Sequence, residues 1–226
     1  MQAGVTKRKV SEMKFPDARL IVFARAPEAG KAKTRLIPAL GAAGAAALHS
    51  RLVTHTLTTV TNAALCPVQL WCAPDTMHPF FDDCKKKSPV TLHQQQGSDL
   101  GERMAHAMNH NLQQGFHSVI IGTDCPALSA TDFEQAFTYL QNDNDIALAP
   151  AHDGGYVLLG LTRFSEKLFS DIQWGTGEVL TTTRERITTL QWSLAELKTF
   201  QDIDRPEDLH EAERLLGPVV RLAPHE

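Results

Sequence analysis

Short apolar runs alternate with longer helical segments along most of this chain. Runs rich in branched or aromatic residues, which favour β-strands, lie at 19–24, 68–72, 90–92, 118–122, 146–149 and 156–161. Segments with helical composition or capping residues lie at 41–64, 77–87, 99–114, 131–141, 177–188 and 206–216. Strands that alternate with helices form a mostly parallel sheet covered by helices on both faces. The sequence therefore predicts an α/β fold of this kind.

One domain accounts for the whole pattern. A chain of 226 residues suits a single core. No linker rich in Gly, Ser or Pro divides it, and no internal repeat is visible. We expect residues 19–226 to form this domain, preceded by a polar N-terminal extension at 1–18.

Composition and charge exclude several classes of protein. A formal net charge of −4 argues against a general nucleic-acid binder. No apolar run approaches the roughly 18 residues of a membrane helix, and the N-terminus lacks the apolar stretch of a signal peptide. The four cysteines form no close pair and lack zinc-finger spacing, as expected of free thiols in a reducing cytosol. We therefore expect a cytoplasmic protein that binds neither nucleic acid nor a membrane.

The loop after the first predicted strand concentrates positive charge in a chain that is acidic overall. Between 24 and 36 it holds four cations and one acid, Glu28. Glycine lets the backbone approach a ligand, and backbone amides with Lys and Arg side chains can hold phosphate oxygens. The alternative is a solvated basic loop. We predict that phosphate is bound by Ala24, Arg25, Ala26, Gly30, Lys31, Lys33 and Arg35.

The spacing of this loop excludes a Walker P-loop. Arg25 stands where the first glycine of that motif belongs. Ala32 replaces the hydroxyl residue that follows its Gly-Lys pair. The loop therefore indicates phosphate binding of another kind.

Two carboxylates lie where metal ligands are expected. Asp124 follows an apolar strand, so its side chain should project at the carboxyl end of that strand. The alternating acids Asp202 and Asp204 precede a helix that begins with proline, a pattern typical of a second metal carboxylate. Mg²⁺ or Mn²⁺ requires such oxygen ligands and would bridge to substrate phosphates. The alternatives are a turn or cap role for Asp124, and N-capping by Asp204 with Glu207 and Asp208 favouring the helix dipole.

A third loop, at 150–156, contains Asp-Gly-Gly between two predicted strands. Asp153 could bind a hydroxyl or act as a catalytic base, but the same residues fit a hairpin turn. Asp99 and Arg103 open a helix, where capping explains them equally well, and Trp174 could serve packing alone. With these alternatives open, the candidate substrate-binding residues are Asp99, Arg103, Gly154, Gly155, Tyr156 and Trp174.

The order of these loops resembles one known group of proteins. The stretches are FARAP and GKAKTRL at 23–36, DLGERM at 99–104, GTDCP at 122–126, DGGY at 153–156, WGT at 174–176 and DIDRPEDL at 202–209. As a set they are similar to bacterial proteins of unknown function in the GT-A, or nucleotide-diphospho-sugar transferase, superfamily. That group includes glycosyltransferase-like proteins associated with radical-SAM and selenodomain proteins or with arsenosugar biosynthesis.

The resemblance implies a Rossmann-like GT-A sheet, with the basic loop near nucleotide phosphates and Asp124 near the metal. The final stretch is similar to the terminal carboxylate motif of sugar and cofactor nucleotidyltransferases, whose acid before Thr-Pro-Glu-Asp binds metal. This role carries over onto Asp204, with Arg205 in place of the usual Thr. The basic loop departs from the nucleotidyltransferase pattern, which has more glycines and an Arg-Met ending.

The leading hypothesis is glycosyl transfer from a nucleoside-diphosphate sugar to an unknown small-molecule acceptor. Mg²⁺ or Mn²⁺ with Lys33 and Arg35 would neutralise the departing diphosphate, and Asp153 would act as a base. One alternative is nucleotidyl transfer from an NTP to a phosphorylated acceptor, with release of pyrophosphate. Another is a nucleotide-binding module without catalysis. The sequence leaves the base, the sugar and the acceptor open.

Overall fold

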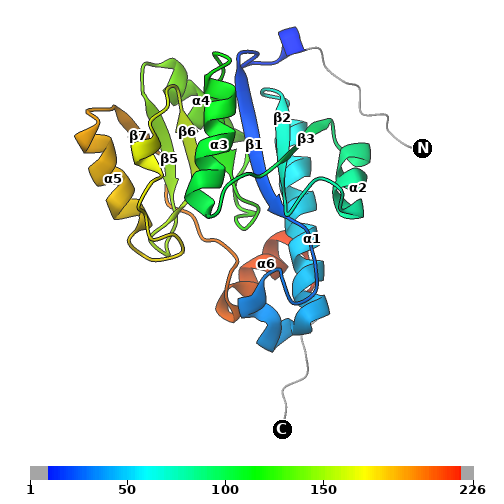
Figure 1. Cartoon of the computed structure of the whole chain (residues 1–226). Helices are drawn as coiled ribbons and strands as arrows, with labels where there is room; N and C mark the ends of the chain where they lie inside the picture. The colour runs from blue at the N-terminus through cyan, green and yellow to red at the C-terminus, as the bar shows by residue number, and fades with distance from the viewer. Residues whose placement is uncertain (1–9, 220–226) are drawn as a thin grey trace.

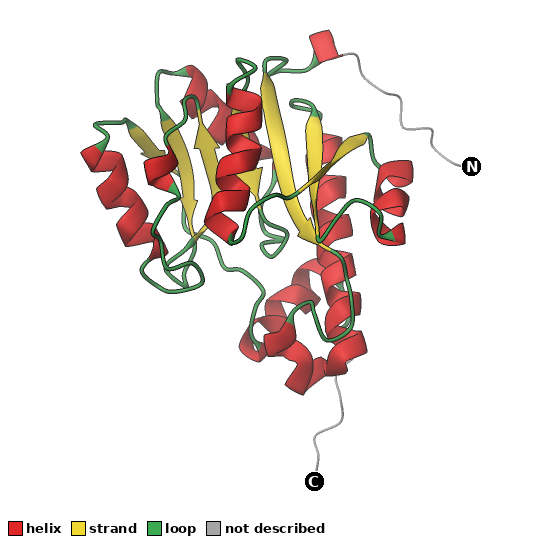
Figure 2. Cartoon of the chain, in the orientation of Figure 1, coloured by secondary structure: helices red, strands yellow, loops and turns green. Residues whose placement is uncertain are grey.

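A seven-stranded sheet forms the centre of the protein in the computed structural model, which describes residues 10–219 (Figures 1 and 2). The strands are arranged in the order β3-β2-β1-β4-β6-β5-β7. Their bounds are β1 Ala18–Arg25, β2 Val68–Ala73, β3 Val90–Gln94, β4 His117–Ile121, β5 Ile146–Pro150, β6 Tyr156–Leu161 and β7 Leu194–Glu196. Only β6 pairs antiparallel with its neighbours among these strands. The predicted mostly parallel sheet is confirmed.

Helices cover both faces of the sheet, as predicted. They are α1 Ile37–Ala63, α2 Pro79–Lys87, α3 Leu100–Leu112, α4 Ala130–Gln141, α5 Val179–Thr189 and α6 Leu209–Leu216. One hydrophobic cluster joins the sheet to α1, α2 and α4, and a second joins it to α3 and α5. Strand β1 serves both, because successive side chains alternate across a sheet. Leu20 and Val22 lie in the first cluster, whereas Ile21 and Phe23 lie in the second.

The antiparallel direction of β6 brings its start to the edge where the parallel strands end. Pro150, the last residue of β5, pairs with Tyr156, the first residue of β6. The loops that follow β1, β4 and β5 therefore meet at one edge of the sheet, the lower edge in Figure 1. This edge is where open α/β sheets bind their ligands.

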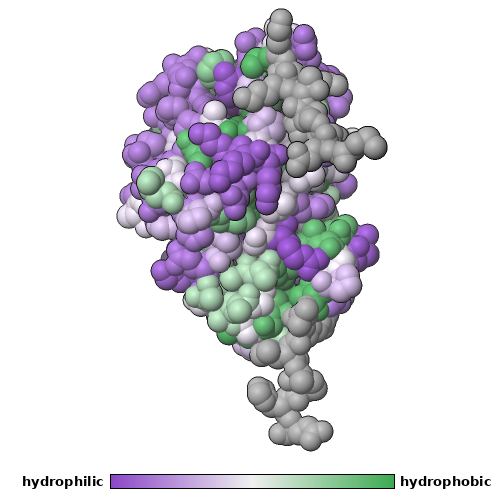
Figure 3. Space-filling view, turned by 90° about the vertical axis from the view of Figure 1, so that its right-hand side faces the viewer, coloured by the Kyte–Doolittle hydropathy of each residue, from purple (hydrophilic) through white to green (hydrophobic). Residues whose placement is uncertain are grey.

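A small helical unit lies below this edge. Helix α1 begins at Ile37, earlier than the predicted start at 41, and bends at Gly41 (φ 69°, ψ 164°). Its first turns pack with α6 through a third cluster that includes Leu36, Leu48 and Ile203. On the face seen in Figure 3, apolar residues gather at the level of this helical unit. Polar residues cover much of the surface above them.

The segment Thr34–Ala63 is long and apolar enough to cross a membrane by length and composition alone. However, 44% of its most apolar window is buried inside the protein. Leu52 and Leu57 on this helix are almost completely buried in the two clusters that α1 joins. Burial of this kind is expected of a core helix.

The chain before β1 packs on the domain where it is described. Phe15 is 2% exposed, and its ring lies 5.2 Å from that of Phe137 in α4. Ala18, which the prediction assigned to the extension, is the first residue of β1. Residues 1–9 of the predicted extension lie outside the described residues. The polar extension therefore ends earlier than predicted, because Phe15 belongs to the core.

The sequence predicts no strand at Leu194–Glu196, which form β7. This three-residue strand pairs parallel with β5, from Ile146 opposite Leu194 to Leu148 opposite Glu196. Three residues are too few to show a periodic pattern, so the ladder with β5 decides the conformation.

Candidate functional site

A cavity of about 860 Å³ opens at the edge where the parallel strands end. Most of the predicted site residues line it, namely Ala24, Arg25, Lys31, Lys33, Arg35, Asp99, Arg103, Asp124, Asp153, Gly155, Tyr156, Trp174 and Asp204. Ala26, Gly30 and Gly154 do not. The fold thus brings together residues that are far apart in the sequence.

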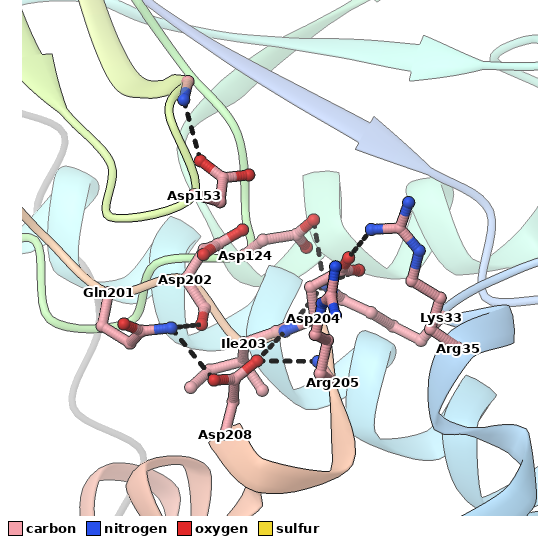
Figure 4. Close-up of polar contacts among 11 residues, drawn as sticks. Lys33, Arg35, Asp124, Asp153, Gln201, Asp202, Ile203, Asp204, Arg205 and Asp208 are labelled. Atoms are coloured by element: carbon pink, nitrogen blue, oxygen red, sulfur yellow. Dashed lines mark hydrogen bonds and ion pairs between the residues drawn. The ribbon is translucent and has the colours of Figure 1, made fainter. Parts of the chain in front are cut away.

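Lys33 lies in the wall of this cavity with its side chain only 3% exposed. Its backbone is left-handed (φ 49°, ψ 46°), a conformation that costs a non-glycine residue roughly 1–2 kcal/mol. The Nζ atom lies 2.9 Å from Oδ2 of Asp124 and 3.7 Å from Oδ1 of Asp204, and it donates a hydrogen bond to the carbonyl of Ile203 (Figure 4). The predicted phosphate ligand therefore neutralises the two predicted metal ligands in this structure.

The other cations of the basic loop differ in their partners. Nη1 of Arg35 lies 2.5 Å from Oδ2 of Asp204, and Nζ of Lys31 lies 2.5 Å from Oε2 of Glu28. The side chain of Arg25 is exposed at the cavity and makes no hydrogen bond or ion pair with another described residue. Of the four, Arg25 is thus the cation whose guanidinium is available to an anionic ligand.

Asp208 is the third residue of a capping box at the start of the last helical segment, whose N-cap is Arg205. Its Oδ2 accepts hydrogen bonds from the backbone N–H groups of Asp204 (3.0 Å) and Arg205 (2.7 Å). Ile203 is fully buried, and its N–H donates to the carbonyl of Asp124 (2.7 Å). The hypothesis that Asp204 caps this helix is wrong, because Arg205 is the N-cap of the turn at Pro206–Asp208 and Asp208 is the N-cap of α6. The Asp204 side chain is left to face Lys33 and Arg35 (Figure 4).

Asp202 is a further carboxylate of the cavity that was not among the predicted site residues. Burial raises the pKa of Asp202, and the negative charges of Asp153 and Asp124 raise it further. Oδ1 of Asp153 accepts a hydrogen bond from the N–H of Gly155 (2.9 Å). Asp153 therefore both stabilises the β5–β6 turn and lines the cavity.

The two glycines of this turn have different roles. Gly154 has φ 89°, and a Cβ atom there would lie 2.3 Å from the carbonyl oxygen of Gly177. Its lack of a side chain allows close packing against Gly177, and Gly154 does not line the cavity. Gly155 lines the cavity as predicted.

The start of α3 supplies another part of the lining. Asp99 caps this helix by accepting from the N–H of Glu102 (2.8 Å), so the capping explanation holds for this residue. Nε of Arg103 donates to the carbonyl of Gly97 (2.9 Å). The Trp174 indole packs over Gly101, where a Cβ atom would lie 2.4 Å from its Nε1, and meets the Tyr156 ring edge-to-face at 6.4 Å.

Two lining residues come from places that local motifs do not mark. His49, in the middle of α1, is 6% exposed, and its Nε2 lies 2.9 Å from the carbonyl oxygen of Arg25. Burial lowers the pKa of His49, so the neutral ring donates this hydrogen bond from Nε2. Gln95, after β3, donates from Nε2 to the carbonyls of Ala24 (3.3 Å) and Trp71 (2.9 Å). Both support the backbone around the basic loop.

A family of uncharacterized proteins conserved in bacteria, DUF2064, matches residues 56–176, which is more than half of the chain. The chain belongs to this family. The DUF2064 match includes Asp99, Arg103, Asp124, Asp153 and Tyr156. The basic loop and Asp204 lie outside it, so the Lys33 contacts join the matched region to both flanking segments.

Solved structures show the same fold. A provisionally assigned nucleotide-diphospho-sugar transferase from Desulfovibrio desulfuricans is 29% identical, with 88% of each chain covered and a TM-score of 0.79. A CMP-2-keto-3-deoxy-manno-octonic acid synthetase in complex with CTP is 11% identical, covering 88% of this chain and 97% of that one, with a TM-score of 0.56. A 4-diphosphocytidyl-2C-methyl-D-erythritol synthase from Anaerococcus prevotii is also 11% identical, with coverage of 91% and 99% and a TM-score of 0.57. No curated protein matches the chain. The predicted GT-A-like fold is confirmed.

Proposed function

We propose that this protein transfers a glycosyl group from a nucleoside-diphosphate sugar to a small-molecule acceptor, with Mg²⁺ or Mn²⁺ held by Asp124 and Asp204. The observation that carries the proposal is the convergence of these two carboxylates on one positive charge in the cavity wall. The likeness to the nucleotide-diphospho-sugar transferase at 29% identity supports this class of substrate.

The two carboxylates suit a hard divalent cation. Their oxygens lie 2.9 and 3.7 Å from the Lys33 ammonium, so a single cation is within reach of both. No group of three or more His, Cys, Asp or Glu side chains is arranged as a metal site within residues 10–219. The diphosphate and water would therefore complete the coordination. When bound, the metal supplies neutralisation of the charge that develops on the leaving diphosphate.

The remaining residues of the cavity have roles that follow from their contacts. The available guanidinium of Arg25 would bind diphosphate oxygens beside the β1 loop. Arg103 is positioned by Gly97 through Nε, which leaves its two Nη groups for a second anionic contact. Asp153 would accept the proton of the acceptor hydroxyl. Tyr156 and Trp174 would pack against the sugar.

Product analysis separates this reaction from nucleotidyl transfer. The protein is incubated with Mn²⁺ and a panel of nucleoside-diphosphate sugars, and separately with NTPs and sugar phosphates. Glycosyl transfer releases free nucleoside diphosphate from the first panel. Pyrophosphate from the second panel, with no diphosphate from the first, would favour the alternative reaction.

Calorimetry with UDP and GDP tests the metal carboxylates directly. We expect wild-type protein to bind one of these diphosphates at least tenfold more tightly with Mn²⁺ than without it. Asp124→Asn and Asp204→Asn should each lose this gain, because each removes an anionic ligand. Asp83→Asn is the matched control, since Asp83 is an exposed carboxylate of α2 paired with Lys86. A gain that persists in Asp124→Asn would contradict the proposed site.

A further inference from the structure

Lys33 uses the same carboxylate oxygens that the proposed function assigns to a metal. Its Nζ atom is surrounded by Oδ2 of Asp124, Oδ1 of Asp204 and the carbonyl oxygen of Ile203. The side chain is 3% exposed, so little water screens its charge. A divalent cation bound to both carboxylates would lie within a few ångströms of this ammonium and would be repelled by it. The two cations therefore compete for one position.

The backbone of Lys33 is fixed on both sides. Ala32 is 3% exposed and Leu36 is completely buried, and the N–H of Leu36 donates to the Lys33 carbonyl (2.9 Å). The ammonium can therefore leave the carboxylates by rotation of its side chain while the loop stays in place. Lys33 lines the cavity together with Arg25, so a rotated ammonium would enter the space where a diphosphate is expected.

We propose that the Lys33 ammonium is the resident cation of the Asp124–Asp204 pair and that a divalent metal binds by displacing it. The displaced ammonium then pairs with the diphosphate of the substrate. This inference rests on the proposed function for the metal and the diphosphate. Competition with Lys33 makes metal binding weak in the absence of nucleotide. It also couples the binding of the metal to the binding of the substrate.

The decisive measurement is the affinity for Mn²⁺ alone, from the electron paramagnetic resonance signal of free Mn²⁺. Lys33→Met removes the competing charge and keeps an apolar stem of similar length. We expect it to bind Mn²⁺ at least tenfold more tightly than wild type, although it removes a polar group from the site. Lys31→Met is the matched control in the same loop, because Lys31 is exposed and pairs with Glu28. Its Mn²⁺ affinity should stay within twofold of wild type.

The double variant Lys33→Met with Asp124→Asn locates the effect. It should lose the gain, because the carboxylate pair is then incomplete. A folded Lys33→Met protein with unchanged or weaker Mn²⁺ affinity would overturn the proposal. Since no nucleotide or acceptor is present, a failure to detect sugar transfer would leave this result standing.

A second measurement needs no variant. Reductive methylation followed by mass spectrometry reports which lysine ammonium groups are accessible in wild-type protein. We expect Lys33 to be protected without metal and to react at saturating Mn²⁺, whereas Lys31 reacts in both conditions. Continued protection of Lys33 at saturating Mn²⁺ would show that the metal does not displace it, and the proposal would fail.

Discussion

The two walls of the cavity are held together by different forces. The charged wall, formed by Lys33, Arg35, Asp124 and Asp204, consists of ion pairs between segments about 90 to 170 residues apart in sequence. The aromatic wall, formed by Tyr156 and Trp174, depends on close packing at positions that lack a Cβ atom. Trp174 lies over Gly101, and Gly154 meets Gly177.

This difference assigns different properties to the two walls. Ion pairs can exchange partners when another ion arrives, so the charged wall can respond to metal, phosphate and pH. Packing against glycine leaves no such freedom, because any added atom meets backbone or an indole ring. The aromatic wall should therefore keep its shape while the charged wall changes partners.

The largest effect is expected from Gly154→Ala in the turn beside the aromatic wall. The new Cβ atom would lie 2.3 Å from the Gly177 oxygen, on a backbone with φ 89°. We expect the free energy of unfolding to fall by about 3 kcal/mol, because steric overlap adds to left-handed strain. Urea denaturation followed by circular dichroism measures this loss.

Gly30→Ala is the matched control for that substitution. Gly30 has φ 82°, close to that of Gly154, but a Cβ atom there would meet nothing within 4 Å. We expect a loss of only about 1 kcal/mol, from backbone strain alone. Equal losses in the two variants would show that close packing does not hold the turn.

The fold was largely predictable because its signals are local. A few consecutive residues are enough to recognise the apolar runs that form β1, β2 and β4 and the alanine-rich segment that forms α1. The direction of β6 has no such signal, because a strand pattern is the same read either way. The three residues of β7 show no pattern, and their pairing with β5 decides their conformation.

The site was predicted as a set of residues but not as a set of contacts. The loop sequence marks Lys33 and Arg35 as cations, but it contains no information about their partners near 124 and 204. Lys33 donates to the carbonyl of Ile203, whose side chain packs in the third cluster with Leu36, a residue far from it in the sequence. For the same reason, His49 became a candidate only when the fold placed it at the cavity.

A smaller loss of stability is expected from Asp124→Asn in the charged wall. This change removes the nearer carboxylate of a buried ammonium, 2.9 Å away, and leaves Asp204 at 3.7 Å. Breaking a buried ion pair costs about 3–5 kcal/mol. The loss here should be about 2 kcal/mol, because a second carboxylate remains and Asp124 is itself 47% exposed. Asp83→Asn, whose pair with Lys86 is exposed, should change the unfolding free energy by less than about 0.5 kcal/mol. Similar losses in both variants would show that Lys33 does not depend on Asp124.

The smallest effect is the pH dependence that His49 gives to the charged wall. Burial lowers the pKa of His49 below its ordinary value of 6.5, so the folded protein keeps the ring neutral where the unfolded chain binds a proton. Stability from this group is therefore present above pH 6.5 and is lost as the pH falls below it. In His49→Gln the amide can still donate to the Arg25 carbonyl but does not titrate. We expect this variant to lose less stability between pH 6.5 and 5, by up to about 1 kcal/mol per pH unit. His152→Gln, at an exposed position on the β5–β6 turn, should follow the wild-type profile in the same urea titrations. A His49→Gln profile parallel to wild type would mean that the acid sensitivity of this wall comes from its carboxylates instead.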